Sequence, residues 1–128
     1  MEKIEQTLLD ECGKLPQRSG LNWGQREGRE PNQAYIKVSS SNYGFFPLDT
    51  QFEIRTKDGH SFICVIAQQG GKAIHTPNDN SEFGRYFRNK LGVPLGSPIS
   101  ISDLTRYGRT SVTFSKINSN TNTYMMDF

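Results

Sequence analysis

The residues best suited to chemistry lie in a polar segment near the start of the chain, residues 21–33, with the sequence LNWGQREGREPNQ. Guanidinium groups, side-chain amides and glycines stand together here, ahead of the strand-like run 34–38. Arginine can bind guanine or phosphate through two N–H groups, asparagine and glutamine can bind adenine, and glycine lets a backbone approach a ligand closely. These residue types are typical of a polar arm that reads a nucleic acid, and none of them suggests a hydrolytic centre. The candidate contacts are Trp23, Gln25, Arg26, Arg29, Asn32 and Gln33.

An ordinary surface loop would explain the same residues. Gly24, Gly28 and Pro31 favour turns. The alternating charges on the loop could pair with one another on the surface: Arg26, Glu27, Arg29 and Glu30. A second polar segment, residues 68–80 (QQGGKAIHTPNDN), favours the binding interpretation, because two such segments on one small domain indicate a clamp.

The second segment mixes hydrogen-bond donors with one carboxylate, which suits the reading of purines and of cytosine N4. Asp79 is informative because phosphates repel a carboxylate unless it accepts a hydrogen bond from a base. The alternative is an ordinary turn that leads into a helix. The candidate contacts here are Lys72, His75, Thr76, Asn78, Asp79 and Asn80.

Arg106 and Arg109 have a spacing that suits the binding of phosphates, which would position the domain without reading sequence. By contrast, Arg85, Arg88 and Lys90 are expected to face solvent on a helix.

Length and composition fit one soluble domain over residues 1–128. The net charge of +2 is only mildly basic and does not by itself indicate nucleic acid. Cys12 and Cys64 have no zinc-site spacing, and we expect both to be reduced and buried. No cofactor or metal is implied. The N-terminus has acids in its first turn and no continuous apolar stretch, so neither a signal peptide nor a membrane span is expected, and the cytoplasm is the expected location.

The elements that position these residues are mostly strands. Apolar residues at helical spacing predict an N-terminal helix over 1–15. Asp58 and Gly59 predict a hairpin between runs 52–56 and 61–67. Phe83, Phe87 and Leu91 predict a helix that ends at Gly92, and runs 110–117 and 124–128 read as strands. Together they predict a curled, mostly antiparallel barrel with short helices at its ends.

The chain resembles the B3-like DNA-recognition domain of a group of bacterial type II restriction endonucleases. The resemblance covers most of the chain beyond its first residues: 21–36 (LNWGQREGREPNQAYI), 71–80 (GKAIHTPNDN), 87–92, 103–113 (DLTRYGRTSVT) and 124–128 (YMMDF). It implies an open pseudobarrel of about seven or eight strands, with two arms that reach into the DNA major groove. The N-arm would be residues 21–33 and the C-arm residues 68–80, with Arg106 and Arg109 on the adjoining rim.

In that family cleavage takes place on a separate domain. This chain has no HxK motif and no PD-(D/E)xK spacing, so a nuclease domain is expected in cis or in trans. The expected function is therefore sequence-specific binding of double-stranded DNA, without catalysis by this chain. An N-terminal position in the parent enzyme would suggest a CC(A/T)GG-type target.

The same residues are compatible with three other functions. One is a small metal-independent nuclease that uses His75 with Arg109. Another is a barrel that binds single-stranded RNA or DNA by stacking bases on Tyr35, Tyr43 or Phe45. A third is a protein-interaction domain, which would show no salt-dependent affinity for DNA.

Overall fold

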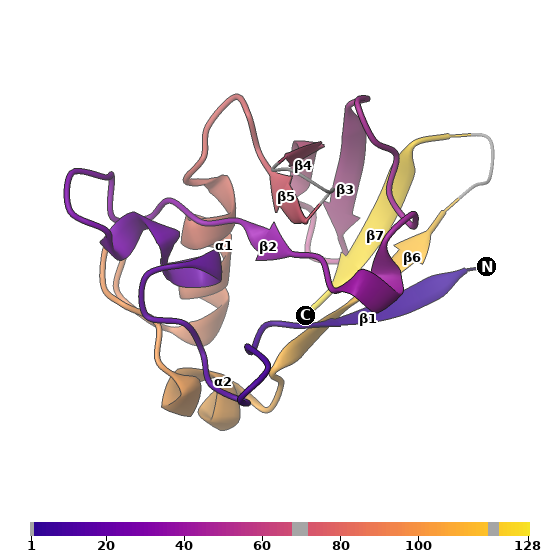
Figure 1. Ribbon diagram of the computed structural model, residues 1–128. Helices are drawn as coiled ribbons and strands as arrows, with labels where there is room; N and C mark the ends of the chain where they lie inside the picture. Colours follow the sequence, from indigo (N-terminus) through magenta and orange to yellow (C-terminus); the bar gives the residue numbers. More distant parts are fainter. Residues whose placement is uncertain (1, 68–71, 118–120) are drawn as a thin grey trace.

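Seven strands within the described residues form one curled, mixed sheet (Figure 1). The computed structural model describes residues 2–67, 72–117 and 121–128. The sheet order is β1-β6-β7-β3-β4-β5-β2, and every neighbouring pair is antiparallel except β3 and β7. The strands are β1 (Lys3–Thr7), β2 (Ile36–Lys37), β3 (Phe52–Thr56), β4 (Ser61–Ala67), β5 (Ala73–His75), β6 (Ser111–Lys116) and β7 (Thr123–Asp127).

The sheet nearly closes on itself, with a seam between its edge strands β1 and β2, which confirms the expected open pseudobarrel. Two α-helices, α1 (Glu82–Leu91) and α2 (Ile101–Tyr107), and two 3-10 helices, η1 (Gly20–Gln25) and η2 (Ser40–Asn42), complete the described elements. In Figure 1, α1 and η1 lie together on the side away from β6 and β7.

The predicted N-terminal helix is wrong, because residues 3–7 form strand β1 against β6. Gln6 explains both the structure and the error. Its side chain is buried, accepts a hydrogen bond from the Ser39 backbone N–H at 2.8 Å and donates to the Ser39 hydroxyl at 2.7 Å. A glutamine on the inward face hides the strand alternation, and its bonds to Ser39, just beyond β2, bridge the seam.

Cys12 also differs from expectation, since it lies in an exposed turn after β1. Cys64, on β4, is buried as expected, and burial raises the pKa of its thiol.

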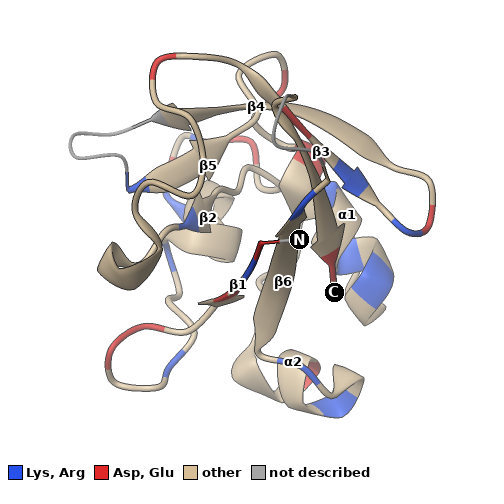
Figure 2. Cartoon of the chain, turned by 90° about the vertical axis from the view of Figure 1, so that its right-hand side faces the viewer, with Lys and Arg blue, Asp and Glu red and all other residues tan. Residues whose placement is uncertain are grey.

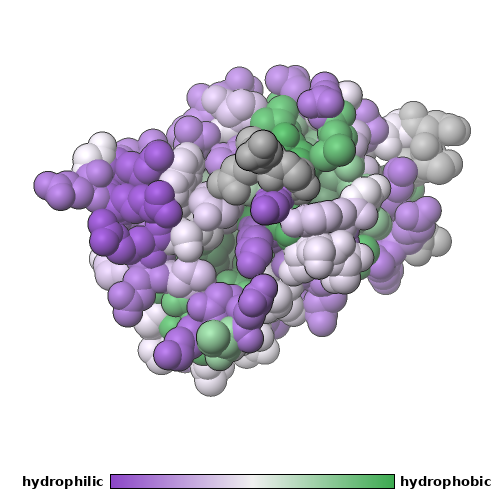
Figure 3. All heavy atoms as spheres, viewed as in Figure 1, coloured by the Kyte–Doolittle hydropathy of each residue, from purple (hydrophilic) through white to green (hydrophobic). Residues whose placement is uncertain are grey.

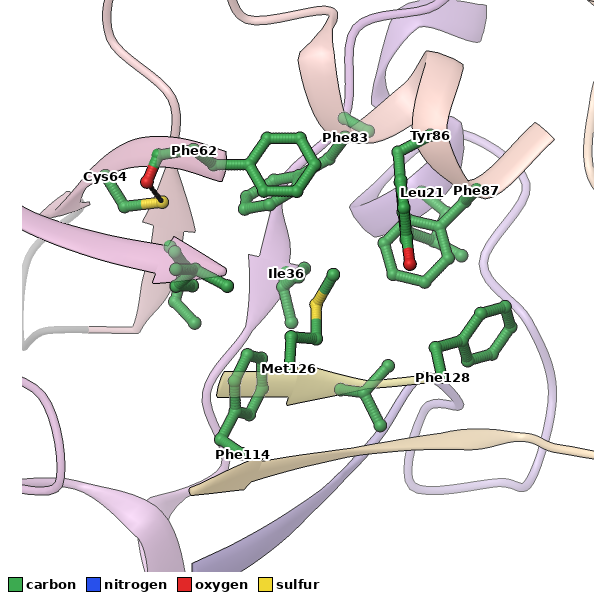
Figure 4. Close-up of a cluster of buried hydrophobic side chains, with 14 of the residues drawn as sticks. Leu21, Ile36, Phe62, Cys64, Phe83, Tyr86, Phe87, Phe114, Met126 and Phe128 are labelled. Carbon is green, nitrogen blue, oxygen red and sulfur yellow. Dashed lines mark hydrogen bonds between the residues drawn. The ribbon is translucent and has the colours of Figure 1, made fainter. Parts of the chain in front are cut away.

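The predicted hairpin and the predicted second helix are confirmed. Asp58 and Gly59 connect β3 and β4, and Gly59 has a φ of 92°, which favours glycine. Helix α1 ends at Gly92, which adopts a left-handed conformation. Phe83, Phe87 and Leu91 of this helix point into the core, where Figure 4 shows the two phenylalanines close to residues from η1 and from several strands.

Arg88 corrects the expectation that the basic residues of α1 face solvent. Its side chain is fully buried. The guanidinium donates to the carbonyl oxygens of Ser97 at 2.8 Å, Gly84 at 3.1 Å and Pro31 at 3.4 Å. Arg88 therefore ties α1 to the N-arm and to the loop that follows the helix.

Candidate nucleic-acid interface

The N-arm, residues 21–33, is a closed loop held at its base. Its first part forms η1, in which Leu21 and Asn22 are buried. The Asn22 amide donates to the Pro16 and Ile99 carbonyls and accepts from the Ile99 N–H, so it fixes the start of the arm. The N–H of Gly24 donates to the Gln33 carbonyl at 2.8 Å and closes the loop. A side chain at Gly24 would collide with the backbone of Glu30 and Pro31, so only glycine fits this crossing.

At the tip of the arm, a turn brings Arg29 back over Trp23. The Arg29 N–H donates to the Arg26 carbonyl at 3.2 Å, and Gly28 has a φ of 84°. The Cζ atom of Arg29 lies 3.8 Å from the centroid of the Trp23 ring, a cation–π contact. Arg29 Nη1 also donates to the Gln33 side-chain oxygen at 2.9 Å. Two contacts from the arm itself thus orient an exposed guanidinium.

Trp23 belongs to an aromatic cluster that joins the N-arm to the sheet. The Tyr35 and His75 rings stack with centroids 5.2 Å apart, and the Trp23 ring meets them edge-on at 5.5 Å and 5.4 Å. The pairing of Ile36 with Ile74 places Tyr35 across from His75 on the face opposite the core. The sheet register therefore brings residues of both predicted arms together.

The surroundings of His75 in this cluster favour its neutral form over its charged form. Burial lowers its pKa below the ordinary value, and the charge of Arg29 lowers it further. Its Nε2 atom is buried and makes no hydrogen bond to the described residues.

The rest of the described C-arm is a turn at the start of α1. Asp79 accepts a hydrogen bond from the Ser81 N–H at 2.9 Å and pairs with Arg85 at 2.6 Å. Both contacts lower the pKa of Asp79, and the contact with Arg85 has the larger effect. The Thr76 hydroxyl donates to the Asp79 carbonyl at 2.6 Å. These bonds account for Asp79 and Thr76 as turn residues. Residues 68–71 of the predicted C-arm lie outside the described residues.

The turn rests against the stem of the N-arm. The Ala34 N–H donates to the Asn80 carbonyl at 3.0 Å, and the Ser81 hydroxyl donates to the Glu30 carboxylate. The two predicted arms therefore share one support. Within the turn itself, Pro77 and Asn78 are exposed.

Two amide side chains among the candidate contacts, Asn32 and Gln25, make hydrogen bonds that brace the arm. Asn32 accepts from the Gly96 N–H at 2.6 Å and donates to the Glu30 carboxylate at 3.1 Å. Gln25 donates to the Pro31 carbonyl at 3.0 Å and to that of Gly96 at 3.3 Å. The loop after α1 thus supports the arm from behind.

The structure does not join Arg106 or Arg109 to the Trp23 cluster. Arg106 donates to Asp103 within α2 and to the Leu91 carbonyl at the end of α1. Arg109 donates to the Asp127 carbonyl at 3.1 Å and to the Thr113 hydroxyl at 3.0 Å, which ties it to β7 and β6. No contact between described residues links Arg109 to His75, as the nuclease interpretation would need.

The predicted sites omit Lys37, which the strand alternation could have indicated. In the run 34–38, every second residue is buried, so Tyr35 and Lys37 share the outward side. Lys37 and the predicted Lys72 both line a hollow of about 370 Å³ next to Tyr35. Arg26 is also exposed at the arm tip, where its Nε donates to the Arg18 carbonyl at 2.8 Å.

Charge and polarity are unevenly spread over the surface. Figure 3 shows strongly hydrophilic residues at the end of the molecule where Figure 1 places the N-arm. Basic residues also lie on α1 and α2, with acids nearby (Figure 2). Among the described residues, no helix is both long and apolar enough to cross a membrane.

Comparison with known protein families gives one finding. Residues 1–118 match the family described as the NgoFVII C-terminal B3-like DNA-binding domain. No curated protein matches the chain. The family is named after a C-terminal domain, so it gives no support to the N-terminal position on which a CC(A/T)GG-type target would depend.

Proposed function

Because the chain belongs to the family of B3-like DNA-binding domains of restriction enzymes, we propose that it recognises a short, specific sequence in double-stranded DNA. In this proposal the chain supplies target recognition, and a nuclease domain, in cis or in trans, supplies cleavage. The N-arm and the outward face of β2 and β5 enter the major groove, where the four base pairs present different hydrogen-bonding patterns. The cytoplasm is the proposed location.

The observation that carries this proposal is the cluster of Arg29, Trp23, Gln33, Tyr35 and His75. It places an oriented guanidinium on an exposed surface to which both polar segments contribute. Reading a base requires donors that are held in a fixed direction, whereas non-specific binding to phosphates needs only charge.

Neighbouring cations supply the phosphate contacts in this proposal. Arg26 lies on the same turn as Arg29, while Lys37 and Lys72 line the hollow beside Tyr35. Each contact with a phosphate releases counterions, so these residues give affinity that falls with added salt. Asn78 and Asn80 at the turn remain candidate base contacts, and Arg106 and Arg109 candidate phosphate contacts. The bonds of Asn32, Gln25, Thr76 and Asp79 favour supporting roles for these four.

Selection of bound sites from a randomised duplex library tests the proposal. We expect a short consensus, and binding to the selected duplex that an excess of single strand does not compete away. Enrichment of no sequence, or better competition by single strand than by duplex, would contradict it and favour a barrel that stacks unpaired bases.

Incubation of the chain with plasmid, with magnesium and separately with chelator, tests for catalysis. We expect intact plasmid in both. Cleavage that persists with chelator and is lost in His75→Ala would instead support the small nuclease.

A further inference from the structure

We infer that Trp23 and Gln33 hold the guanidinium of Arg29 as a fixed fork that reads one guanine of the target. The inference rests on the proposed function and names one base and the residues that position its reader. Arg29 is the contacting residue, and Trp23 and Gln33 are positioning residues.

The Trp23 ring supports the guanidinium of Arg29 from one side. A guanidinium over the face of an indole at 3.8 Å loses freedom to rotate, because the cation–π attraction favours that contact. The indole is itself held, since Tyr35 and His75 meet it at interplanar angles of 74° and 87°. The Trp23 ring of η1 therefore supports the Arg29 guanidinium, and it is held in turn by Tyr35, next to β2, and by His75 of β5.

Gln33 limits the rotation of the Arg29 guanidinium within its own plane. Arg29 Nη1 donates to the Gln33 Oε1 atom at 2.9 Å. The Gln33 backbone is fixed in turn, because its carbonyl accepts from Gly24 and its N–H donates to the Glu30 carbonyl. Because Nη1 is bonded to Gln33, the edge that remains is the one formed by Nε and Nη2. These two atoms make no hydrogen bond to another described residue, and the Arg29 side chain is exposed.

Guanine is the base that matches the free edge of Arg29. The free edge presents two parallel N–H donors, and in the major groove guanine presents two neighbouring acceptors, N7 and O6. Adenine presents a donor beside N7, so it can accept only one of the two bonds. Burial and the charge of Arg29 lower the pKa of His75, which disfavours a second positive charge beside the guanidinium.

Phosphate also accepts two parallel hydrogen bonds, so the test must separate the two acceptors. Lysine keeps the charge of Arg29 but has no planar fork. A lysine at this position would therefore retain a phosphate contact and could still donate to N7 or O6 of guanine, but without the fixed pair of donors it would prefer guanine less strongly.

The experiment is parallel site selection with the wild-type chain and with Arg29→Lys, and Arg55→Lys as the matched control. Arg55 is an exposed arginine on β3 that pairs with Glu53. We expect the wild-type and control preferences to agree at every position, and Arg29→Lys to show a weaker preference for guanine at one position only. An equally strong preference for guanine at every position in Arg29→Lys would overturn the inference and leave the proposed function standing. A wild-type chain that selects no sequence would overturn both.

Titration of the selected duplex with single guanines replaced by 7-deazaguanine identifies the acceptor, because this analogue lacks N7. We expect a loss of roughly 5- to 150-fold in wild-type affinity at one guanine, and a smaller loss there in Arg29→Lys. Equal wild-type affinity for every substituted duplex would assign Arg29 to phosphate and overturn the inference.

Gln33 is tested through the same ratio of affinities for guanine and 7-deazaguanine. Gln33→Leu removes the acceptor and should reduce the ratio at that guanine, while affinity for a scrambled duplex is unchanged. Gln33→Glu keeps an acceptor and should restore the ratio even where its charge weakens binding to all duplexes. A ratio unchanged in Gln33→Leu would show that Gln33 does not position the fork.

Discussion

His75 is a histidine whose ring contacts are aromatic and whose Nε2 is buried without a hydrogen bond to the described residues. Its lowered pKa means that, as pH falls below the ordinary value of about 6.5, the unfolded chain takes up a proton that the folded chain does not. Stability should then decrease until the folded pKa is reached. Urea unfolding of wild type and His75→Gln from pH 8 to pH 5 measures this, and the variant should show the smaller decrease.

Arg29 contributes to that lowered pKa through its charge. We therefore predict that Arg29→Gln raises the pKa of His75, as followed by NMR of the imidazole in a His60→Gln background that leaves one histidine. An unchanged pKa would mean that the guanidinium does not remain over the cluster in solution.

Arg88 shows how one side chain joins elements. Arg88→Met removes the donors for three carbonyls while keeping much of the buried volume, and we predict a loss of about 1–3 kcal/mol in the free energy of unfolding. Arg85→Met is the matched control on the same helix, since its surface pair with Asp79 should contribute roughly 0–1 kcal/mol. Urea denaturation compares the two, and equal losses would contradict a special role for Arg88.

At the scale of elements, the contact between α1 and the N-arm depends on Gly84. A side chain there would collide with the Asn32 carbonyl. Alanine usually stabilises a helix interior by about 1 kcal/mol over glycine, but Gly84→Ala should destabilise by about 1–3 kcal/mol through overpacking. It should also weaken binding to the selected duplex as the arm shifts. Asn89→Ala, at an exposed site of α1, should leave both stability and binding nearly unchanged.

Local patterns predicted the elements whose own residues specify them. Asp58-Gly59 specifies a hairpin turn, and Phe83, Phe87 and Leu91 specify the buried face of α1. Strand β1 was missed because Gln6 occupies an inward position, where its partners come from residue 39. Arg88 was missed for a similar reason, since its acceptors include Pro31. A polar side chain can be buried when residues far away in the sequence satisfy its hydrogen bonds. A local sequence pattern does not contain those partners and so does not predict the burial.

At the scale of the whole molecule, the candidate site depends on sheet register. The sequence indicates two polar segments, but only the pairing of β2 with β5 stacks Tyr35 on His75 under the N-arm. Hydrogen bonds outside the sheet link two other candidate contacts to their own surroundings, Asn32 to the Gly96 N–H and Asp79 to the Ser81 N–H. The residue types predict which hydrogen bonds the two segments could offer. The pairing of strands far apart in the sequence decides which of these side chains lie together on the outer face.

The most direct test of sequence-specific duplex recognition is equilibrium titration of the selected duplex and a scrambled duplex at two salt concentrations. We predict a ratio of affinities of roughly 10³ or more, with both affinities decreasing as salt increases. A ratio near one at both salt concentrations would contradict it, because binding would then depend on phosphate charge alone.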